Sequence, residues 1–443
     1  MNTTSTARIV CVSDKGIELC AAAARISTTK GSALTLLERE KDIDRDRDLI
    51  KKVLGSGHKS LIEHHVFSIA FDNVSVLVEQ FLIEFRLSSF IVKSRRYVDF
   101  KDSGFYVPDA LTGELREKYI AAMTARFEDY AFLTERGVPK EDARFVLPYC
   151  FYSNFYMTLN ARQLLNVIFA MRFGRGQVFG ELRDLGKQLS DQFEEIYPGI
   201  IEAERKHLPE CKIESVWDGF ESAHVVQPLT QLISAPHDAP ALLNQSLAFA
   251  GRYTQAYLRE LTADARPREL EALNYTFKLS GVSLSCITHF ARHRIQSPMF
   301  KPVRCALSGG GYVLPQSIAQ AGSEISTRYH NAFKETENNA RALSAGGLND
   351  EYVSYFALSG HTTELFFTMN ARELMHFMKL RTCERAQWEI RHFSEDMLAQ
   401  LRTSYPALFN CYGPGCAVTG KCPEGRLCCG HPRVLPCAGA AKP

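Results

Sequence analysis

The chain has 443 residues, which exceeds the size of most single hydrophobic cores and predicts two or three domains. Its hydrophobic share of 45% and charged share of 23% are typical of water-soluble globular proteins. A net charge of +2 gives no overall attraction to nucleic acid or to a membrane surface, so neither is expected as a partner. The first residues carry no secretory signal pattern, and no apolar run reaches the roughly 18 residues of a membrane span. We therefore expect a cytoplasmic protein.

The first predicted strand with a clear pattern spans residues 67–71, where Phe67, Ile69 and Phe71 fall on one face. The pattern returns 208 residues later, at residues 275–279, with tyrosine, phenylalanine and leucine at the matching positions. A Val-Ser pair and an apolar segment typical of a helix follow each strand. Each of these predicted helices ends in a cluster that contains arginine.

The two arginine clusters align at the same spacing of 208 residues, but their residues differ. The first reads Glu84-Phe85-Arg86 and the second reads Arg292-His293-Arg294. Downstream, the first half continues with Ser94-Arg95-Arg96-Tyr97, where the second half has Pro302-Val303-Arg304-Cys305. Arginines on a helix are often only a solvated surface. The repeated pattern favours one anion-binding site divided between two copies of a domain, because guanidinium groups bind phosphate oxygens in pairs.

A second landmark also occurs twice. Asn160-Ala161-Arg162 and Asn370-Ala371-Arg372 each precede helical sequence, and each half then reaches a Tyr-Pro pair. Ordered landmarks of this kind predict a tandem duplication of one α/β (α+β) domain. We place the first domain at residues 1–208, a linker at 209–224, the second domain at 225–409 and a cysteine-rich tail at 410–443.

Together these landmarks resemble the flavin-dependent thymidylate synthases, the ThyX family. The family signature holds Arg-His-Arg, two serines and an Arg-Tyr pair, followed by Asn-x-Arg and a helix with a further arginine. The first half also has Ala24-Arg-Ile-Ser27 and a segment from Gly57 to His64 that are similar to other parts of the family. The resemblance covers nearly the whole chain, twice. It implies two ThyX-like domains, each an antiparallel sheet with flanking helices.

The resemblance implies reductive methylation of dUMP to dTMP. In this family FAD carries the reducing hydride, NADPH reduces the flavin, and 5,10-methylenetetrahydrofolate donates the carbon. FAD and dUMP both carry phosphate groups, which suits a site that is rich in arginine.

Carried over residue by residue, the second half supplies one side of the family's site. The resemblance implies flavin contacts at Arg292, His293, Arg294, Asn370 and Arg372, and nucleotide contacts at His289, Arg292 and Arg381. The first half departs at these places, because Glu84 and Phe85 replace Arg-His and Met171 stands where Arg381 is.

The first half keeps the other side of the site. The resemblance implies flavin contacts at Ser27, Ser60 and His64, and nucleotide contacts at Ser94, Arg95, Arg96 and Arg144. The second half has Ser354 at the Arg144 position. In the homotetrameric family, the nucleotide lies between the Arg-His-Arg side of one subunit and the second-serine loop of another. The expected catalytic residues are therefore Arg292 and Arg381 from one repeat and Ser94 from the other.

We expect one working class of composite site and one inactive class, in a homodimer that acts as a pseudo-tetramer. The working class combines the arginines of the second repeat with the serine loop of the first. The inactive class would place Glu84 toward a phosphate, and like charges repel.

Two other functions stay open. The first is a flavin- and folate-dependent methylase or hydroxymethylase of another pyrimidine nucleotide. His376, where the family often has an asparagine, and Pro298-Met299-Phe300 leave room for this activity. The second is a non-catalytic paralogue that binds flavin or nucleotide. Complementary loss in the two halves argues against the latter, because neutral decay would not distribute the losses in this way.

The tail is rich in cysteine, glycine and proline, a composition that suits a tight loop around a metal ion. Four thiolates can close a tetrahedral zinc site. The predicted ligands are Cys411, Cys416, Cys422 and either Cys428 or the adjacent Cys429, with redox-active or free thiols as the alternatives.

Overall fold

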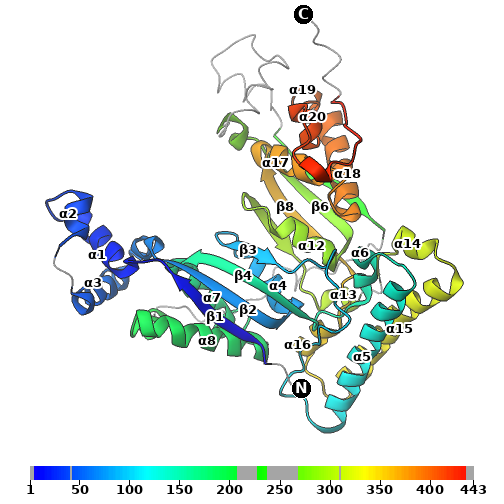
Figure 1. Ribbon diagram of the computed structural model, residues 1–443, viewed down its shortest axis with the longest axis horizontal. Coiled ribbons are helices and arrows are strands. Elements are labelled where there is room, and N and C mark those ends of the chain that lie inside the picture. Colours follow the sequence, from blue (N-terminus) through cyan, green and yellow to red (C-terminus); the bar gives the residue numbers. More distant parts are fainter. Residues whose placement is uncertain (1–3, 40–41, 207–226, 237–267, 309–310, 436–443) are drawn as a thin grey trace, which may run out of the picture. The chain divides into compact units, whose positions relative to one another are not determined.

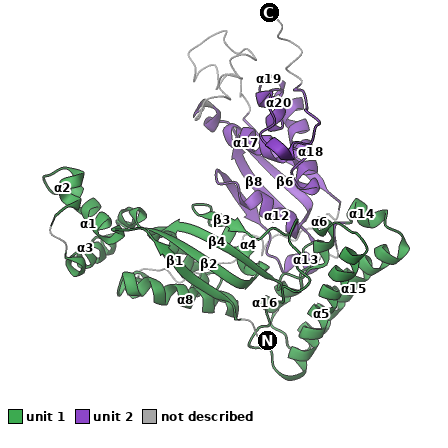
Figure 2. Ribbon diagram, in the orientation of Figure 1, with its two compact units in different colours: residues 1–221, 314–359 green, residues 222–313, 360–443 purple. Residues whose placement is uncertain are grey.

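The computed structural model describes residues 4–39, 42–206, 227–236, 268–308 and 311–435. Figure 2 shows that the chain forms two compact units. Unit 1 contains residues 1–221 together with 314–359, and unit 2 contains residues 222–313 and 360–443. The units therefore differ from the repeats, because a helical segment of the second repeat belongs to the compact unit of the first. The predicted linker at 209–224 lies outside the described residues.

Unit 1 combines a four-stranded sheet with helices (Figure 1). The first repeat contributes β1 (Thr6–Val12), α1 (Gly16–Ile26), α2 (Ala33–Leu37), α3 (Ile43–Gly55), η1 (Lys59–His64), β2 (Val66–Ser75), α4 (Val76–Ile83), β3 (Ser89–Val92), α5 (Gly113–Glu135), α6 (Lys140–Ala143), η2 (Arg144–Val146), β4 (Tyr152–Asn160), α7 (Ala161–Arg172), α8 (Gly180–Ile196) and α9 (Ile200–Arg205). The second repeat contributes α14 (Gln316–Ala319), α15 (Ser323–Ala345), α16 (Asp350–Val353) and η4 (Ser354–Phe356).

Unit 2 has its own four-stranded sheet and the cysteine-rich tail. Its described elements are β5 (Leu229–Ser234), η3 (Arg268–Ala272), β6 (Asn274–Ser283), α12 (Leu284–Ala291), β7 (Gln296–Phe300), α13 (Cys305–Ser308), β8 (Thr362–Asn370), α17 (Ala371–Arg381), α18 (Trp388–Ser404), α19 (Pro406–Phe409), α20 (Gly415–Thr419) and η5 (Gly425–Leu427). Within the described ranges, no helix combines the length and the apolar character that crossing a bilayer requires.

The two sheets have equivalent strand orders, β1-β2-β4-β3 and β5-β6-β8-β7, and all neighbouring strands are antiparallel. This confirms the predicted α+β class and the two repeats. The long strands β2 and β6 shift register at equivalent places, within residues 71–74 and 279–282. Each bulge holds a residue with positive φ, Asn73 at 52° and Gly281 at 66°. A Cβ on Gly281 would lie 2.6 Å from the carbonyl oxygen of Gln227, so only glycine fits there.

One face of each sheet forms a core, as the alternating pattern predicts. Phe67, Ile69 and Phe71 of β2 are fully buried, and so are the inward side chains at 275, 277 and 279 of β6. Helices α7 and α8 pack on the first sheet, and α17 and α18 pack on the second. Burial of each large apolar side chain contributes about 1.5–3 kcal/mol, which makes these faces the main source of stability in each sheet.

Glutamine side chains bond to one edge strand of each sheet, β1 in the first and β5 in the second. In unit 1, two glutamines of α8 accept hydrogen bonds from β1. Gln188 Oε1 accepts from the backbone N–H of Ala7 at 2.9 Å, and Gln192 Oε1 accepts from the backbone N–H of Ile9 at 2.8 Å. In unit 2, Gln400 Oε1 of α18 accepts from the N–H of Leu232 at 3.0 Å. These bonds satisfy backbone donors on edge strands that lack a further neighbour.

An antiparallel pairing joins the two repeats inside unit 1. The N–H of Tyr149 donates to the carbonyl oxygen of Ala357 at 2.8 Å, and the N–H of Ser359 donates to that of Leu147 at 2.9 Å. Tyr149 and Ser359 occupy equivalent positions of the two repeats, and so do Leu147 and Ala357. Each segment therefore meets its own counterpart, which is the pattern of a two-fold interface between identical subunits.

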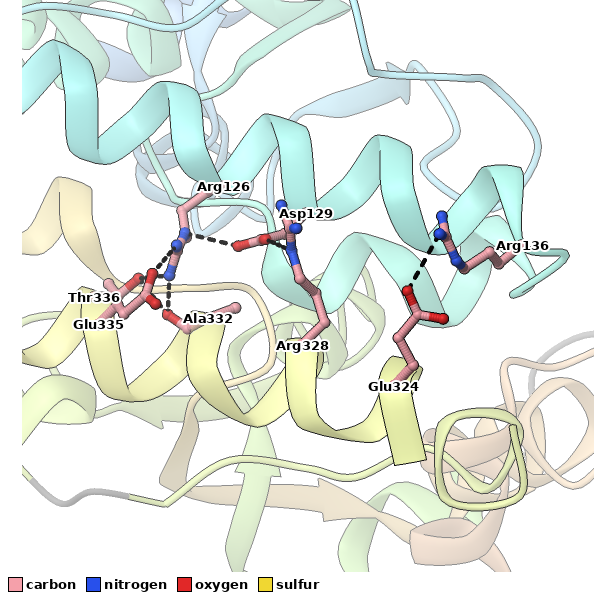
Figure 3. A network of polar contacts seen from close by, with 8 residues as sticks. All are labelled: Arg126, Asp129, Arg136, Glu324, Arg328, Ala332, Glu335 and Thr336. Carbon is pink, nitrogen blue, oxygen red and sulfur yellow. Dashed lines mark hydrogen bonds and ion pairs between the residues drawn. The ribbon is translucent and has the colours of Figure 1, made fainter. Parts of the chain in front are cut away.

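Helices α5 and α15, one from each repeat, extend this pairing. They pack side by side and antiparallel, with a network of ions between them (Figure 3). The Arg126 guanidinium contacts Glu335 Oε2 at 2.6 Å and Asp129 Oδ2 at 3.1 Å, and it donates to Thr336 Oγ1 at 3.3 Å. Arg328 binds the other oxygen of Asp129. Arg126 and Asp129 are both nearly fully buried, so their charges depend on these partners.

We predict that Arg126→Ala lowers the free energy of unfolding of unit 1 by about 3 kcal/mol, because it deprives a buried carboxylate of one of its two arginines. Arg136→Ala is the matched control. The Arg136 pair with Glu324 at the end of the same helices is exposed (40% and 72% for the two side chains), and its loss should cost at most about 0.5 kcal/mol. Urea denaturation followed by circular dichroism measures both variants. Equal midpoints for the two would contradict the role of the buried network.

Candidate functional site

The second arginine cluster follows α12, whose start is fixed by a serine and a buried carboxylate. Ser283 caps the helix, because its Oγ accepts from the N–H of Cys286 at 3.0 Å. Glu389 of α18 accepts from the N–H of Ser283 at 2.7 Å. Ser75 and Glu181 form the equivalent bond in unit 1, at 2.8 Å. Each repeat thus holds the bulged strand, the short helix and the long helix in the same arrangement.

The three residues after α12 alternate in exposure. Arg292 and Arg294 are exposed, whereas His293 between them is only 4% exposed. The side-chain amide of Gln296 donates to the carbonyl oxygens of Phe290 and His293, which satisfies acceptors at the end of the helix. Two accessible guanidinium groups therefore flank one buried imidazole.

Helix α17 begins at the Asn-x-Arg landmark. The Asn370 side chain caps the helix by accepting from the backbone N–H three residues later, at 2.9 Å. Arg372 Nη1 contacts Glu271 Oε1 at 2.6 Å. The equivalent arginine and glutamate of the first repeat, Arg162 and Glu63, also form an ion pair. Because both repeats keep this pair, it belongs to the shared framework, and the flavin contact expected of Arg372 stays a prediction.

The last residue of α17, Arg381, contacts the buried histidine. Arg381 Nε donates to His293 Nε2 at 3.1 Å, and Arg381 Nη2 donates to the carbonyl oxygen of His289 at 3.1 Å. On its other side, His293 Nδ1 lies 2.8 Å from Glu373 Oε1. The structure thus brings together three of the predicted residues, His289, His293 and Arg381, and joins them to a glutamate.

The imidazole in this arrangement is neutral. Burial, and then electrostatic interactions with Arg381 and His376, lower the pKa of His293 to about 2. Burial also raises the pKa of Glu373, although His376 and Arg372 act in the opposite direction. The histidine therefore transmits hydrogen bonds between a guanidinium and a carboxyl group without adding charge of its own.

The first repeat has no such arrangement at the equivalent positions. Glu84, at the end of α4, pairs with Arg175 at 2.7 Å. The Phe85 ring packs against Phe81, with centroids 5.9 Å apart, and Met171 is fully buried. Apolar packing thus replaces the polar contacts of the second repeat.

The loop after β3 and the start of η2 carry the other predicted arginines of the first repeat. Arg95 is buried, and its Nη2 contacts Glu79 Oε1 at 2.7 Å. Arg96 pairs with the carboxylate of Glu141. Arg144 is also buried, and its Nε donates to the Glu141 carbonyl oxygen at 3.0 Å. Arg96 and Arg144 therefore meet at Glu141, as one compact group beside the loop.

The remaining predicted residues of the first repeat lie near its surface. Ser94, half-buried, follows β3, and its Oγ accepts from the N–H two residues later at 3.3 Å. Ser27 ends α1, while Ser60 and His64 lie in η1, and all three are exposed. Because α1 packs against η1, these three residues lie on neighbouring elements of unit 1.

Three carboxylates that organise these regions are missing from the predicted site. Glu373 carries a recognisable signal, since it stands three residues after the capping Asn370, where capping boxes place glutamate. Glu79 is the charged residue of a helix in which every other residue except Gln80 is apolar, and this pattern indicates a buried partner. No comparable pattern singles out Glu141.

The predicted zinc site in the tail is not found. Within the described residues, no three histidine, cysteine, aspartate or glutamate side chains come together in a group able to hold a metal ion. Cys411 is enclosed in the packing after α19, with 2% of its surface exposed, whereas Cys428 is exposed. Cys411 and Cys428 thus differ in exposure, and the zinc ligand set stays a prediction.

Comparison with known proteins gives consistent matches. Residues 8–199 and 229–407 match the family model of the thymidylate synthase complementing protein, Thy1. The flavin-dependent thymidylate synthase of Geobacter sulfurreducens is 35% identical over 178 residues, covering 40% of this chain and 76% of that protein. The flavin-dependent thymidylate synthase of Clostridium tetani is 32% identical over 194 residues, which cover 39% of this chain and 76% of that protein.

A solved structure also aligns with part of the chain. It is the UMP/dUMP methylase PolB from Streptomyces cacaoi bound with 5-Br dUMP, with a TM-score of 0.40 and 25% identity. The alignment covers 46% of this chain and 96% of that one. Because the family model matches both repeats and most of the sequence, the chain belongs to the Thy1 family, the ThyX family of the sequence resemblance.

Proposed function

We propose that the protein is an FAD-dependent thymidylate synthase that converts dUMP to dTMP. The observation that carries the proposal is the cluster in the second repeat. There the exposed Arg292 and Arg294 flank a buried His293 that binds Arg381. Relatives that match part of the chain are themselves named flavin-dependent thymidylate synthases.

The donor groups of this cluster suit the expected ligands. FAD carries a pyrophosphate and dUMP carries a phosphate, and guanidinium groups bind such oxygens through charge-assisted hydrogen bonds. Arg292 and Arg294 are the residues that would hold FAD, and Arg381 is the residue that would hold the nucleotide. When bound, FAD that NADPH has reduced supplies the hydride, and 5,10-methylenetetrahydrofolate supplies the carbon. The arginines of the chain would stabilise negative charge that develops on the pyrimidine ring.

The proposed site takes its two sides from different repeats. The second repeat provides Arg292 and Arg381, and the first repeat provides the loop with Ser94. The opposite combination would bring Glu84 toward the phosphate and would lack an arginine at position 171, where methionine is fully buried. We therefore expect one active class of site.

The proposed assembly is a homodimer that takes the place of the family's tetramer. Support comes from the pairing of Leu147 and Tyr149 with Ala357 and Ser359, in which each repeat meets its counterpart. One chain thus already contains a contact that two identical subunits would otherwise make.

A second candidate is methylation or hydroxymethylation of another pyrimidine nucleotide. The observation that favours it is His376, an exposed residue whose ring centroid lies 5.9 Å from that of His293. ThyX proteins often have an asparagine at this position. Tritium release from C5-labelled dUMP, compared with C5-labelled UMP and dCMP, separates the two candidates.

The purified full-length chain should contain flavin or take up added FAD, which visible absorbance and quenching of flavin fluorescence measure. Arg292→Ala and Arg294→Ala should each weaken FAD binding about tenfold, because each removes a charge-assisted hydrogen bond. Arg304→Ala, which removes an exposed arginine elsewhere in the second repeat, is the matched control and should bind normally. A native chain that neither contains nor takes up flavin would exclude both enzyme candidates.

Arg381→Ala and Ser94→Ala should each abolish growth rescue of a thymidine-requiring strain. Loss of a phosphate contact from Arg381 should lower kcat/KM for dUMP about a hundredfold. Arg304→Ala should still rescue growth. Normal rescue by the Arg381 and Ser94 variants would show that the two sides of the site are wrongly assigned.

The active species should be a dimer of about twice the 49.8 kDa chain, as light scattering after size-exclusion chromatography can measure. The two repeats of one chain provide only half of the family's four domains. A fully active monomer would contradict this assembly.

A further inference from the structure

A continuous chain of hydrogen bonds connects the end of α17 with its first turn. Arg381 Nε lies 3.1 Å from His293 Nε2, and His293 Nδ1 lies 2.8 Å from Glu373 Oε1. His293 and Glu373 are 4% and 5% exposed, whereas Arg381 is more accessible. This series of hydrogen bonds therefore leads from a buried carboxylate to a more accessible guanidinium group at the proposed nucleotide site.

The direction of these bonds follows from the chemistry of arginine. A guanidinium group donates hydrogen bonds and cannot accept them. His293 Nε2 must therefore be the bare nitrogen, which accepts from Arg381. The proton of the neutral ring must then lie on Nδ1, where it is donated to Glu373. The Glu373 carboxylate thus favours the tautomer in which His293 Nε2 can accept a hydrogen bond from Arg381.

This contact restrains a side chain that would otherwise have many rotamers. Holding an arginine in one geometry costs up to about 2 kcal/mol of side-chain entropy. The bonds to His293 and to the carbonyl oxygen of His289 fix two nitrogens of the Arg381 guanidinium before any ligand arrives. A preorganised group binds its ligand more tightly, because the side-chain entropy is lost on folding and not on binding.

The first repeat provides an internal comparison. All three positions of the chain of bonds differ there: Phe85 replaces the histidine, Gln163 replaces the glutamate, and Met171 replaces the arginine. The helix geometry is nevertheless retained, since Asn160 caps α7 as Asn370 caps α17, at 2.9 Å in both. The glutamate and histidine are thus present in the repeat that has the arginine and absent from the repeat that lacks it.

We propose that Glu373 and His293 are positioning residues, which hold Arg381 in the orientation that receives the phosphate of the nucleotide. This deepens the proposed function and rests on it for the identity of the ligand. Both ring nitrogens of His293 form hydrogen bonds with protein side chains, one with Glu373 and one with Arg381. The histidine therefore acts on the nucleotide through Arg381. Glu373 is the residue that sets the tautomer.

The tautomer of His293 can be measured without any ligand. Selective ¹⁵N labelling of the histidine rings distinguishes a protonated nitrogen from a bare one by its chemical shift. The chain has 13 histidines, and His293→Phe assigns the signal while introducing the residue that the first repeat has at this place. We expect Nδ1–H and a bare Nε2 in the full-length protein. A proton on Nε2 would overturn the proposal.

The link to the nucleotide is tested by calorimetry with dUMP. Glu373→Leu keeps the bulk of the side chain and removes the acceptor, so it should move the proton toward Nε2 and raise the Kd for dUMP about tenfold. Glu373→Gln keeps a carbonyl oxygen as acceptor, so it should retain the tautomer and most of the affinity. In an Arg381→Ala background, Glu373→Leu should have no further effect on binding, because both changes remove the same interaction.

The outcomes separate the proposal from the function on which it rests. Additive losses in the double variant, or an unchanged tautomer in Glu373→Leu, would overturn the positioning role. If Glu373→Leu does not fold, a bare Nδ1 in the native chain or in Glu373→Gln would still overturn it. If the native protein has the expected tautomer but does not bind dUMP, the proposed function is wrong. The hydrogen bonds among Glu373, His293 and Arg381 would still be confirmed.

Discussion

Unit 1 depends on a pairing between equivalent segments of the two repeats. The backbone bonds of Tyr149 to Ala357 and of Ser359 to Leu147 join two segments that lie directly before β4 and β8 in the sequence. The buried ions between α5 and α15 continue the same contact. These bonds fix residues 314–359 in the compact unit of the first repeat, and they determine where the chain leaves one unit and enters the other.

The sequence allows the repeats, the inward faces of β2 and β6 and the start of α17 to be predicted, because alternation and capping are local patterns. It does not reveal that residues 314–359 belong to unit 1, since this depends on contacts between positions about 210 residues apart. Nor does it reveal the burial of Arg95 against Glu79 or of His293 against Glu373. An arginine in a motif has the same sequence signal whether it faces a ligand or a carboxylate.

The candidate site shows how one fold supports two different surfaces. Both repeats keep the capping serine, the buried glutamate and the arginine–glutamate pair, which hold strand and helices in place. Beyond this shared framework, the first repeat fills the positions around Phe85 and Met171 with apolar packing. The second repeat builds a polar chain that ends at Arg381. The framework therefore tolerates loss of the polar groups in one copy while the other keeps them.

Arg126 donates a hydrogen bond to Thr336 at 3.3 Å, and this contact shows that two fused repeats can place different residues at equivalent positions of their interface. These two residues occupy equivalent positions of the two repeats and lie against each other. In an assembly of identical subunits, a residue on the two-fold axis faces a copy of itself, so an arginine there would face a second arginine. Joining the repeats in one polypeptide removes that requirement. A cation can then be placed opposite a hydroxyl group, and each side of the interface can be selected independently.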